Sequence, residues 1–191
     1  MKPTTHKQNH IYNITVISVC TAIVIASAYL TIPFFIGITL QTLAIMLICM
    51  LFDLKISFST VLIYILIGAI GLPVFSGFGG GLSFLVGPTG GFILSFLLFP
   101  IIFKLLGNRF RQSHVLRIIS MCICIVVCYA CGTAWYCFVY LSGNVNNLAG
   151  ALSICVFPFI IPDIIKIFIA DILYSRLSKI DFNRQWRLYG K

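Results

Sequence analysis

Residues 11–30 read IYNITVISVCTAIVIASAYL and contain no charged side chain. An α-helix rises about 1.5 Å per residue, so about 20 predominantly apolar residues are needed to cross the hydrocarbon core of a bilayer. A helix also satisfies its own backbone hydrogen bonds, which lipid cannot do. The stretch therefore predicts a membrane-spanning helix.

Five more apolar stretches follow along the chain. The composition agrees with them, because 60% of the 191 residues are hydrophobic and 9% are charged, whereas soluble globular proteins carry about 25% charged residues. We therefore predict an all-α integral membrane protein with one membrane domain over residues 1–191 and a bundle over residues 11–174. Its six transmembrane helices are expected at residues 11–30, 33–52, 56–71, 91–106, 115–141 and 149–174.

The basic residues predict the orientation of these helices. They lie before the first stretch, at the second-to-third and fourth-to-fifth connections and after the sixth stretch, whereas the other three connections carry no charge. Cytoplasmic loops carry an excess of Lys and Arg, so residues 1–10 and 175–191 are predicted to be cytoplasmic tails. These basic residues are Lys2, Lys7, Lys55, Lys104, Arg109, Arg111, Arg117, Arg176, Lys179, Arg184, Arg187 and Lys191.

The first stretch also has features of a secretory signal peptide, because Ala26-Ser27-Ala28 is similar to a cleavage site. The apolar region of a signal peptide has about 7–15 residues, and this run is longer, which favours an uncleaved first helix. Ser18, Ala22 and Ala26 share one face of that helix, where small side chains let another helix approach closely. They either pack within this chain or dock a separate membrane subunit.

The connection between the third and fourth stretches is rich in glycine. Residues 71–91 contain eight of the fifteen glycines and no charge. A solvated loop would be more polar, so we expect this outer loop to pack over or into the protein, either as a re-entrant turn or as backbone that approaches a ligand closely. The fourth helix would begin at Gly90 and Gly91, where free N–H groups could hold an anionic group.

Two charges lie inside the sixth stretch. Pro158 and Pro162 are expected to interrupt the helix, and Asp163 and Lys166 follow at i, i+3, on one helix face. Ionisable groups in a membrane helix are costly and are usually paired and functional. We therefore predict that the pair contacts a ligand, with a structural ion pair between helices as the alternative.

Other polar side chains interrupt the apolar stretches. Thr39, Gln41 and Thr42 can bond a ligand or another helix, and the sequence favours neither. Asp171 lies near the basic C-terminal cluster. It is expected to pair with Arg176 or with a partner protein.

Several function classes are disfavoured. Without a basic stripe interleaved with aromatic residues, nucleic-acid binding is not expected. All four acidic residues are aspartates, and no Gly-x-x-x-x-Gly-Lys-Ser/Thr motif is present, so neither catalytic residues nor ATP hydrolysis nor a cofactor is expected. Cys128-x-x-Cys131 has no histidine nearby, which favours buried cysteines that act as small hydrophobic residues over a metal site. A cysteine-dependent membrane redox enzyme is the competing class.

Four stretches together resemble the BioY family, the biotin-specific substrate-binding (S) components of energy-coupling factor (ECF) transporters. They are ITLQTL (38–43), GAIGLPVF (68–75), GPTGG (87–91) and PDIIK (162–166). The resemblance implies a six-helix binding protein of the cell (inner) membrane that works with a transmembrane coupling subunit and a pair of ATPases. It also implies that the small-residue face of the first helix docks the coupling subunit. Phe78 and Gly79 depart from the family, which often has a small or polar residue there.

Biotin is the ligand that the resemblance implies. Its ureido ring has two N–H donors and one carbonyl acceptor, which Asp163 and Lys166 would bond, and the Gly90–Gly91 helix start would hold its carboxylate. An S component for another vitamin is the alternative. The candidate substrate-binding residues are Asp163, Lys166, Thr39, Gln41, Phe75, Gly79, Gly80, Thr89, Gly90 and Gly91, and the candidate docking residues are Ser18, Ala22 and Ala26.

Overall fold

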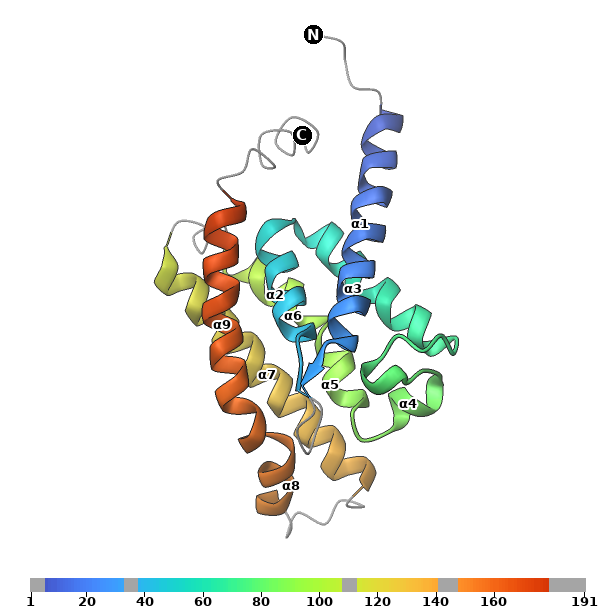
Figure 1. Ribbon diagram of the computed structural model, residues 1–191, viewed down its shortest axis with the longest axis vertical. Coiled ribbons are helices and arrows are strands. Elements are labelled where there is room, and N and C mark those ends of the chain that lie inside the picture. The colour runs from blue at the N-terminus through green and yellow to red at the C-terminus, as the bar shows by residue number, and fades with distance from the viewer. Residues whose placement is uncertain (1–5, 33–37, 108–112, 141–147, 179–191) are drawn as a thin grey trace.

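Helices dominate the computed structural model, which describes residues 6–32, 38–107, 113–140 and 148–178 (Figure 1). The predictions for Lys2, Arg109, Arg111, residues 33–37 and the tail from residue 179 onward lie outside these ranges. In chain order the elements are α1 (His6–Tyr29), β1 (Thr31–Ile32), β2 (Ile38–Thr39), α2 (Gln41–Leu51), α3 (Leu54–Ala69), the 3-10 helix η1 (Ser76–Phe78), α4 (Leu82–Val86), α5 (Gly90–Ser95), α6 (Leu98–Leu105), α7 (His114–Tyr140), α8 (Leu148–Cys155) and α9 (Phe157–Leu177).

Two helices of the described ranges are both long enough and apolar enough to cross a membrane, over His10–Tyr29 in α1 and His114–Val139 in α7. Helix α9 has 21 residues but carries four charged side chains. Helices α2 and α3 and the α5–α6 pair form shorter apolar segments. These apolar helices agree with a membrane location. Helix α1 begins at His6, so the last part of the predicted N-terminal tail is helical.

The fourth predicted helix is divided into α5 and α6. The amides of Phe96 and Leu97 donate to the carbonyls of Ile93 and Leu94, at 3.3 and 3.2 Å. These i to i+3 bonds are typical of 3-10 turns, which tighten the chain where an α-helix ends. The predicted helix at residues 91–106 is therefore two short helices with a bend between them.

The sixth predicted helix is divided at Val156, whose φ and ψ are −125° and −56°. Pro158 lies in the first turn of α9, where its missing N–H has no helical partner to lose. Pro162 lies inside α9, which continues to its end at Leu177. The prediction that Pro162 interrupts the helix was therefore wrong, because near the helix start its ring costs only one backbone hydrogen bond, to the carbonyl of Pro158.

A short strand pair, which the sequence analysis did not predict, joins α1 to α2. Strands β1 and β2 are antiparallel, with Thr31 opposite Thr39 and Ile32 opposite Ile38. Helix α2 begins only at Gln41, later than the predicted start at residue 33. The strand pair therefore fixes the place at which α2 begins.

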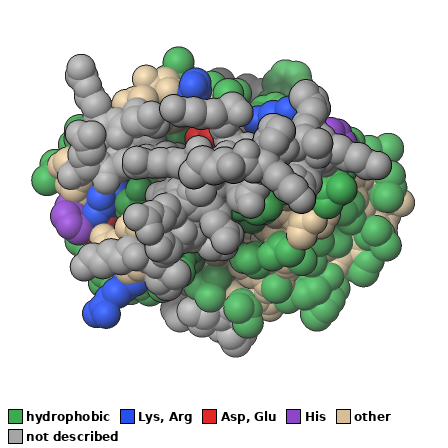
Figure 2. Space-filling model, turned by 90° about the horizontal axis from the view of Figure 1, so that it is seen from above, with side chains coloured by type: hydrophobic (Ala, Val, Ile, Leu, Met, Phe, Trp, Pro, Cys, Tyr) green, Lys and Arg blue, Asp and Glu red, His purple; other side chains and the backbone are tan. Residues whose placement is uncertain are grey.

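The helices enclose one apolar core. Helix α1 packs on α3, α2 on α9 and α5 on α7, and Ile45, Tyr64, Phe75, Phe99 and Met121 are fully buried between them. Much of the outer surface is apolar as well (Figure 2). Soluble proteins rarely expose contiguous apolar patches of this kind, so lipid is the solvent that this surface fits.

Candidate functional site

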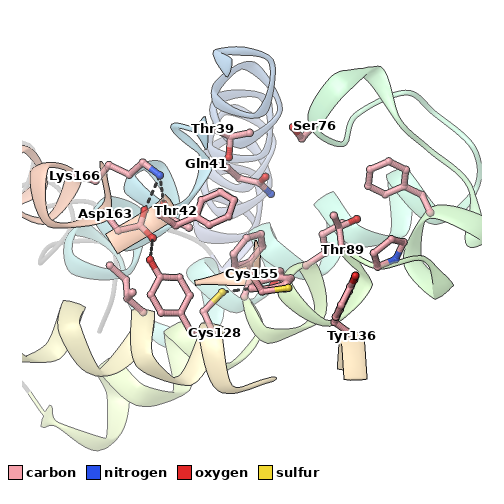
Figure 3. Close-up of a pocket in the computed structure, with 18 residues that line it drawn as sticks. Thr39, Gln41, Thr42, Ser76, Thr89, Cys128, Tyr136, Cys155, Asp163 and Lys166 are labelled. Carbon is pink, nitrogen blue, oxygen red and sulfur yellow. Dashed lines mark hydrogen bonds and ion pairs between the residues drawn. The ribbon is translucent and has the colours of Figure 1, made fainter. Parts of the chain in front are cut away.

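A cavity of about 340 Å³ lies between the helices (Figure 3). Small-molecule sites usually have volumes of about 300–1,000 Å³, so the space suits a small organic ligand. Its walls come from segments that are far apart in the sequence. The lining residues are Thr39, Gln41, Thr42, Ser76, Phe84, Pro88, Thr89, Phe92, Ile93, Phe96, Ile125, Cys128, Tyr129, Tyr136, Cys155, Phe159, Asp163 and Lys166.

Four of these side chains are hydrogen-bonded to one another at one end of the cavity. The Nζ atom of Lys166 lies 2.7 Å from Oδ1 of Asp163 and donates to Oγ1 of Thr42 at 3.3 Å. The Tyr129 hydroxyl donates to Oδ2 of Asp163 at 2.5 Å. Asp163 and Lys166 are each only 5% exposed. We call this group, Thr42, Tyr129, Asp163 and Lys166, the charged end of the cavity.

Local structure accounts for the charged end. Residues at i, i+3 share a helix face, and the face of α9 that carries the ion pair packs against α2 and α7. Helix α2 therefore supplies Thr42, and α7 supplies Tyr129. Buried charges are tolerated when they are paired and hydrogen-bonded, as they are here. The predicted pairing of Asp163 with Lys166 on one face is confirmed.

Aromatic rings form part of the cavity wall. Phe84, Phe92, Phe96 and Phe159 come from α4, α5, the bend after α5 and α9. Aromatic side chains provide large apolar surface and prefer offset or edge contacts with other rings. This part of the cavity fits an apolar ring system.

Further polar groups lie apart from the charged end. In Figure 3, Ser76, Thr89 and Tyr136 lie on the other side of the cavity from the ion pair, and Thr39 and Gln41 lie between the two groups. Gln41 is 4% exposed, and its Nε2 atom has no hydrogen-bond partner among the described residues. A buried donor without a partner costs about 1–3 kcal/mol, so an acceptor on a bound molecule would stabilise it.

Half of the predicted substrate-binding residues line the cavity, and half do not. Asp163, Lys166, Thr39, Gln41 and Thr89 are brought together in its wall. The others lie outside the lining, and the structure gives them packing positions instead. They are Phe75, Gly79, Gly80, Gly90 and Gly91.

The packing positions follow from the neighbours of these residues. Phe75 is fully buried and contacts the Tyr64 ring edge-on, with centroids 5.5 Å apart. A Cβ atom on Gly91 would collide with Trp135, and one on Gly90 would collide with the carbonyl of Leu85. These glycines allow α5 to approach its neighbours closely. The geometry gives no support to their assignment as ligand contacts.

The glycine-rich loop packs onto the protein, as predicted. The amide of Gly81 donates to the carbonyl of Gly68 at 2.7 Å. Phe78 has a positive φ of 60° and stacks on Tyr29, with centroids 4.6 Å apart. Because Ser76 from this loop lines the cavity, the loop forms part of the cavity wall.

Asp171 forms a second ion pair nearer the C-terminal end of α9. Its Oδ1 atom accepts from Nε of Arg117 at 2.5 Å, and its Oδ2 atom lies 2.9 Å from Nδ1 of His114. Arg117 also donates to Ser175 at 3.2 Å. The prediction of a pair with Arg176 was wrong, because α7 packs along α9 and brings Arg117 closer.

The predicted docking face lies on the outside of the molecule. Ser18, Ala22 and Ala26 are all exposed along α1, so they do not serve packing inside the described part of the chain. The cysteines form no metal-binding group with other residues of the described ranges. Cys128 accepts a hydrogen bond from Ser95 at 3.1 Å in the cavity wall.

The sequence analysis missed most of the cavity wall. A tyrosine or phenylalanine in an apolar helix is ordinary core composition, so no sequence signal singled out Tyr129, Tyr136 or the four phenylalanines. Thr42 was noted as a polar interruption but was not assigned to the site. Tyr129 lies 34 positions before Asp163 in the chain, so it is recognised as a site residue only from its contact with Asp163 in the structure.

Comparison with known proteins gives one consistent family. The model of the BioY family matches residues 2–181. The chain is 33% identical to the biotin transporter BioY of Thermotoga maritima over 86% of this chain and 94% of that protein. It is 31% identical to the biotin transporter BioY2 of Lactococcus lactis subsp. cremoris over 85% of this chain and 87% of that protein.

A solved structure agrees with these relatives. The structure resembles the crystal structure of the S component for biotin from an ECF-type ABC transporter, with a TM-score of 0.77 and 26% sequence identity, over 92% of this chain and 95% of that chain. Because the family model covers nearly the whole sequence and the relatives match over most of their length, the chain belongs to the BioY family.

Proposed function

We propose that this membrane protein binds biotin and mediates its uptake as the substrate-binding component of an ECF-type transporter. The observation that carries the proposal is the buried ion pair of Asp163 and Lys166 at one end of a cavity of about 340 Å³ whose other lining residues are uncharged. The names of the relatives support biotin as the ligand. The protein is a transport component and not an enzyme.

The cavity suggests how biotin is oriented. The ureido N–H groups would donate to Asp163, and the ureido carbonyl would accept from Lys166, which has used two of its three hydrogens. The phenylalanine rings would cover the fused ring system. The carboxylate would then reach the hydroxyls of Ser76, Thr89 and Tyr136, which replace the predicted Gly90–Gly91 helix start as its site.

The topology completes the proposal. Six membrane segments would correspond to α1, α2, α3, α5–α6, α7 and α8–α9, with both termini in the cytoplasm. The uncharged first-to-second, third-to-fourth and fifth-to-sixth connections support an outer side that includes the glycine-rich loop. The arrangement is supported by Figure 1, in which the start of α1 and the end of α9 lie at the same end of the molecule.

Uptake driven by ATP would require other chains, since this sequence has no nucleotide-binding motif. A transmembrane coupling subunit would dock on the exposed face of Ser18, Ala22 and Ala26, and an ATPase pair would supply the energy. No cofactor of its own is proposed. Small residues at a helix surface support close docking of a second helix.

A calorimetric titration tests the ligand. Protein purified in detergent and stripped of bound ligand is titrated with biotin, thiamine and riboflavin in turn. We expect one saturable site for biotin and no measurable heat of binding for the other two vitamins. Equal or tighter binding of thiamine or riboflavin would show that this is an S component for another vitamin.

A further inference from the structure

We infer that Tyr129 is a positioning residue that orients the carboxylate of Asp163 and thereby sets the selectivity of the cavity for a ligand with paired N–H donors. The inference deepens the proposed function and rests on it, because it assumes that Asp163 contacts the ligand. The observation behind it is the hydrogen bond from the Tyr129 hydroxyl to Oδ2 of Asp163.

The two oxygens of Asp163 have different partners. Oδ1 accepts from Lys166 on the same helix at 2.7 Å, and Oδ2 accepts from Tyr129 on α7 at 2.5 Å. The terminal torsion of an aspartate has a broad energy minimum, so one donor alone leaves the carboxylate free to turn. A second donor from another helix fixes the plane of the carboxylate relative to the cavity.

The loss of Tyr129 would change which acceptors face the ligand. Without the hydroxyl, the Lys166 ammonium can attract both oxygens of Asp163, because Nζ has a third hydrogen that neither Thr42 nor Oδ1 of Asp163 uses. Lone pairs of Asp163 that face the cavity would then accept from Lys166 and would no longer be available to a ligand. With the hydroxyl in place, one oxygen is held away from Lys166, and both oxygens keep a lone pair for a donor.

A purely structural explanation of the same bond is that Asp163 only satisfies the Tyr129 hydroxyl, since buried tyrosines usually find a partner. The two explanations differ in what they predict. In the structural case, removal of the hydroxyl changes the thermal stability and leaves the biotin affinity alone. In the positioning case, it weakens biotin binding, and the effect depends on Asp163.

The test is a double-mutant cycle measured by titration with biotin. Tyr129→Phe removes the hydroxyl and keeps the ring. Hydrogen bonds to charged groups contribute about 1.5–3 kcal/mol, so Tyr129→Phe should raise the Kd for biotin about 10- to 100-fold. In the Asp163→Asn background, where the charge is gone, the same change should raise the Kd less than about threefold. Because titration reports the number of sites separately from the affinity, partial unfolding lowers the stoichiometry rather than raising the Kd.

Tyr136→Phe is the matched control, since Tyr136 is on the same helix and lines the same cavity away from the charged end. Its effect on biotin binding should be equal in the native and Asp163→Asn backgrounds. Binding of biotin by Tyr129→Phe within twofold of the native affinity would overturn the inference, as would an equal loss in both backgrounds. Failure of the native protein to bind biotin would instead refute the proposed function.

Discussion

At the scale of single residues, the site is a closed set of hydrogen bonds around two opposite charges. Asp163 and Lys166 neutralise each other. Tyr129 donates a second hydrogen bond to Asp163, and Thr42 accepts a second one from Lys166. A buried ion pair rarely stabilises a protein more than apolar residues of similar volume would. Its presence in a membrane helix is therefore best explained by a ligand that needs both an acceptor and a donor.

The first prediction concerns the charge of Asp163. Asp163→Asn keeps the shape of the side chain but replaces an anionic oxygen by an amide, which is a weaker acceptor and adds donors. Loss of a charged hydrogen-bond partner costs about 2–5 kcal/mol in binding, so we expect the Kd for biotin to rise at least about 30-fold. The thermal melt should stay cooperative but at a lower midpoint, because Lys166 loses its buried partner. Lys166→Met, an apolar side chain of similar length, should weaken biotin binding in the same way.

The control for both variants is Lys104→Met, which removes an exposed charge on α6 away from the cavity. It should leave the biotin affinity unchanged. If Asp163→Asn and Lys166→Met both give cooperative thermal melts, which show that they are folded, and both retain near-native affinity, the pair is a structural tie between helices.

The sequence predicted the charged pair but not its neighbours, and the reason is physical. A charge within an apolar membrane stretch is costly and rare, so its presence in the sequence is enough to mark a candidate site. Tyr129 and the aromatic wall carry no such penalty and match ordinary core composition. They belong to the site only through the packing of α5 on α7 and of α7 on α9, which no local pattern specifies.

At the scale of elements, short and broken helices shape the cavity. The division between α5 and α6, the break at Val156 and the strand pair before α2 each place a polar or aromatic residue at the cavity wall. Hydropathy predicted where the apolar stretches lie, because burial in lipid acts on whole segments. It could not predict the breaks, because 3-10 turns and close glycine contacts depend on the neighbouring helices.

The second prediction concerns the ion pair between α7 and α9. Asp171→Asn leaves Arg117 without its charged partner, and the Arg117 side chain is only 5% exposed. Removal of one partner from a buried pair costs about 3–5 kcal/mol, so the thermal midpoint should fall clearly. Because the pair lies two turns from Asp163, the Kd for biotin should change less than about threefold. Arg176→Gln, at the residue that the sequence first favoured as the partner, should leave the midpoint unchanged, and a larger loss for Arg176→Gln would contradict the observed pairing.

The third prediction concerns the exposed face of α1. Ala22→Leu and Ala26→Leu add bulk where a second helix would approach closely, and overpacking typically costs about 1–3 kcal/mol. Co-purification with a coupling subunit should therefore fall about 5- to 100-fold, and biotin binding should stay intact. Val19→Leu enlarges a residue that is already large and exposed on the same helix, and it should have little effect. Unchanged co-purification of both alanine variants would show that the docking face lies elsewhere.

At the scale of the whole molecule, the proposed orientation in the membrane rests on the distribution of the basic residues along the chain. Apart from Lys166, the basic residues, including those in tails outside the described ranges, all lie in or near the connections and tails that are predicted to be cytoplasmic. This pattern was readable from the sequence because translocation depends on the charges near each helix rather than on tertiary contacts.

The fourth prediction tests this orientation. Alkaline phosphatase, which is active only outside the cytoplasm, is joined after Gly81 or after Ser113 of the truncated chain. We expect activity for the first fusion, in the glycine-rich loop, and none for the second, at the start of α7. The reverse pattern would place the loop and the cavity opening on the cytoplasmic side.

The central claim is that the cavity with Asp163 and Lys166 is the biotin site. A structure of the protein purified with biotin tests it most directly. We expect the ureido ring within about 2.7–3.2 Å of a carboxylate oxygen of Asp163 and of Nζ of Lys166, with the ring system between the phenylalanines and the carboxylate towards Thr89 and Tyr136. Biotin bound at another place, with this cavity empty, would contradict the account.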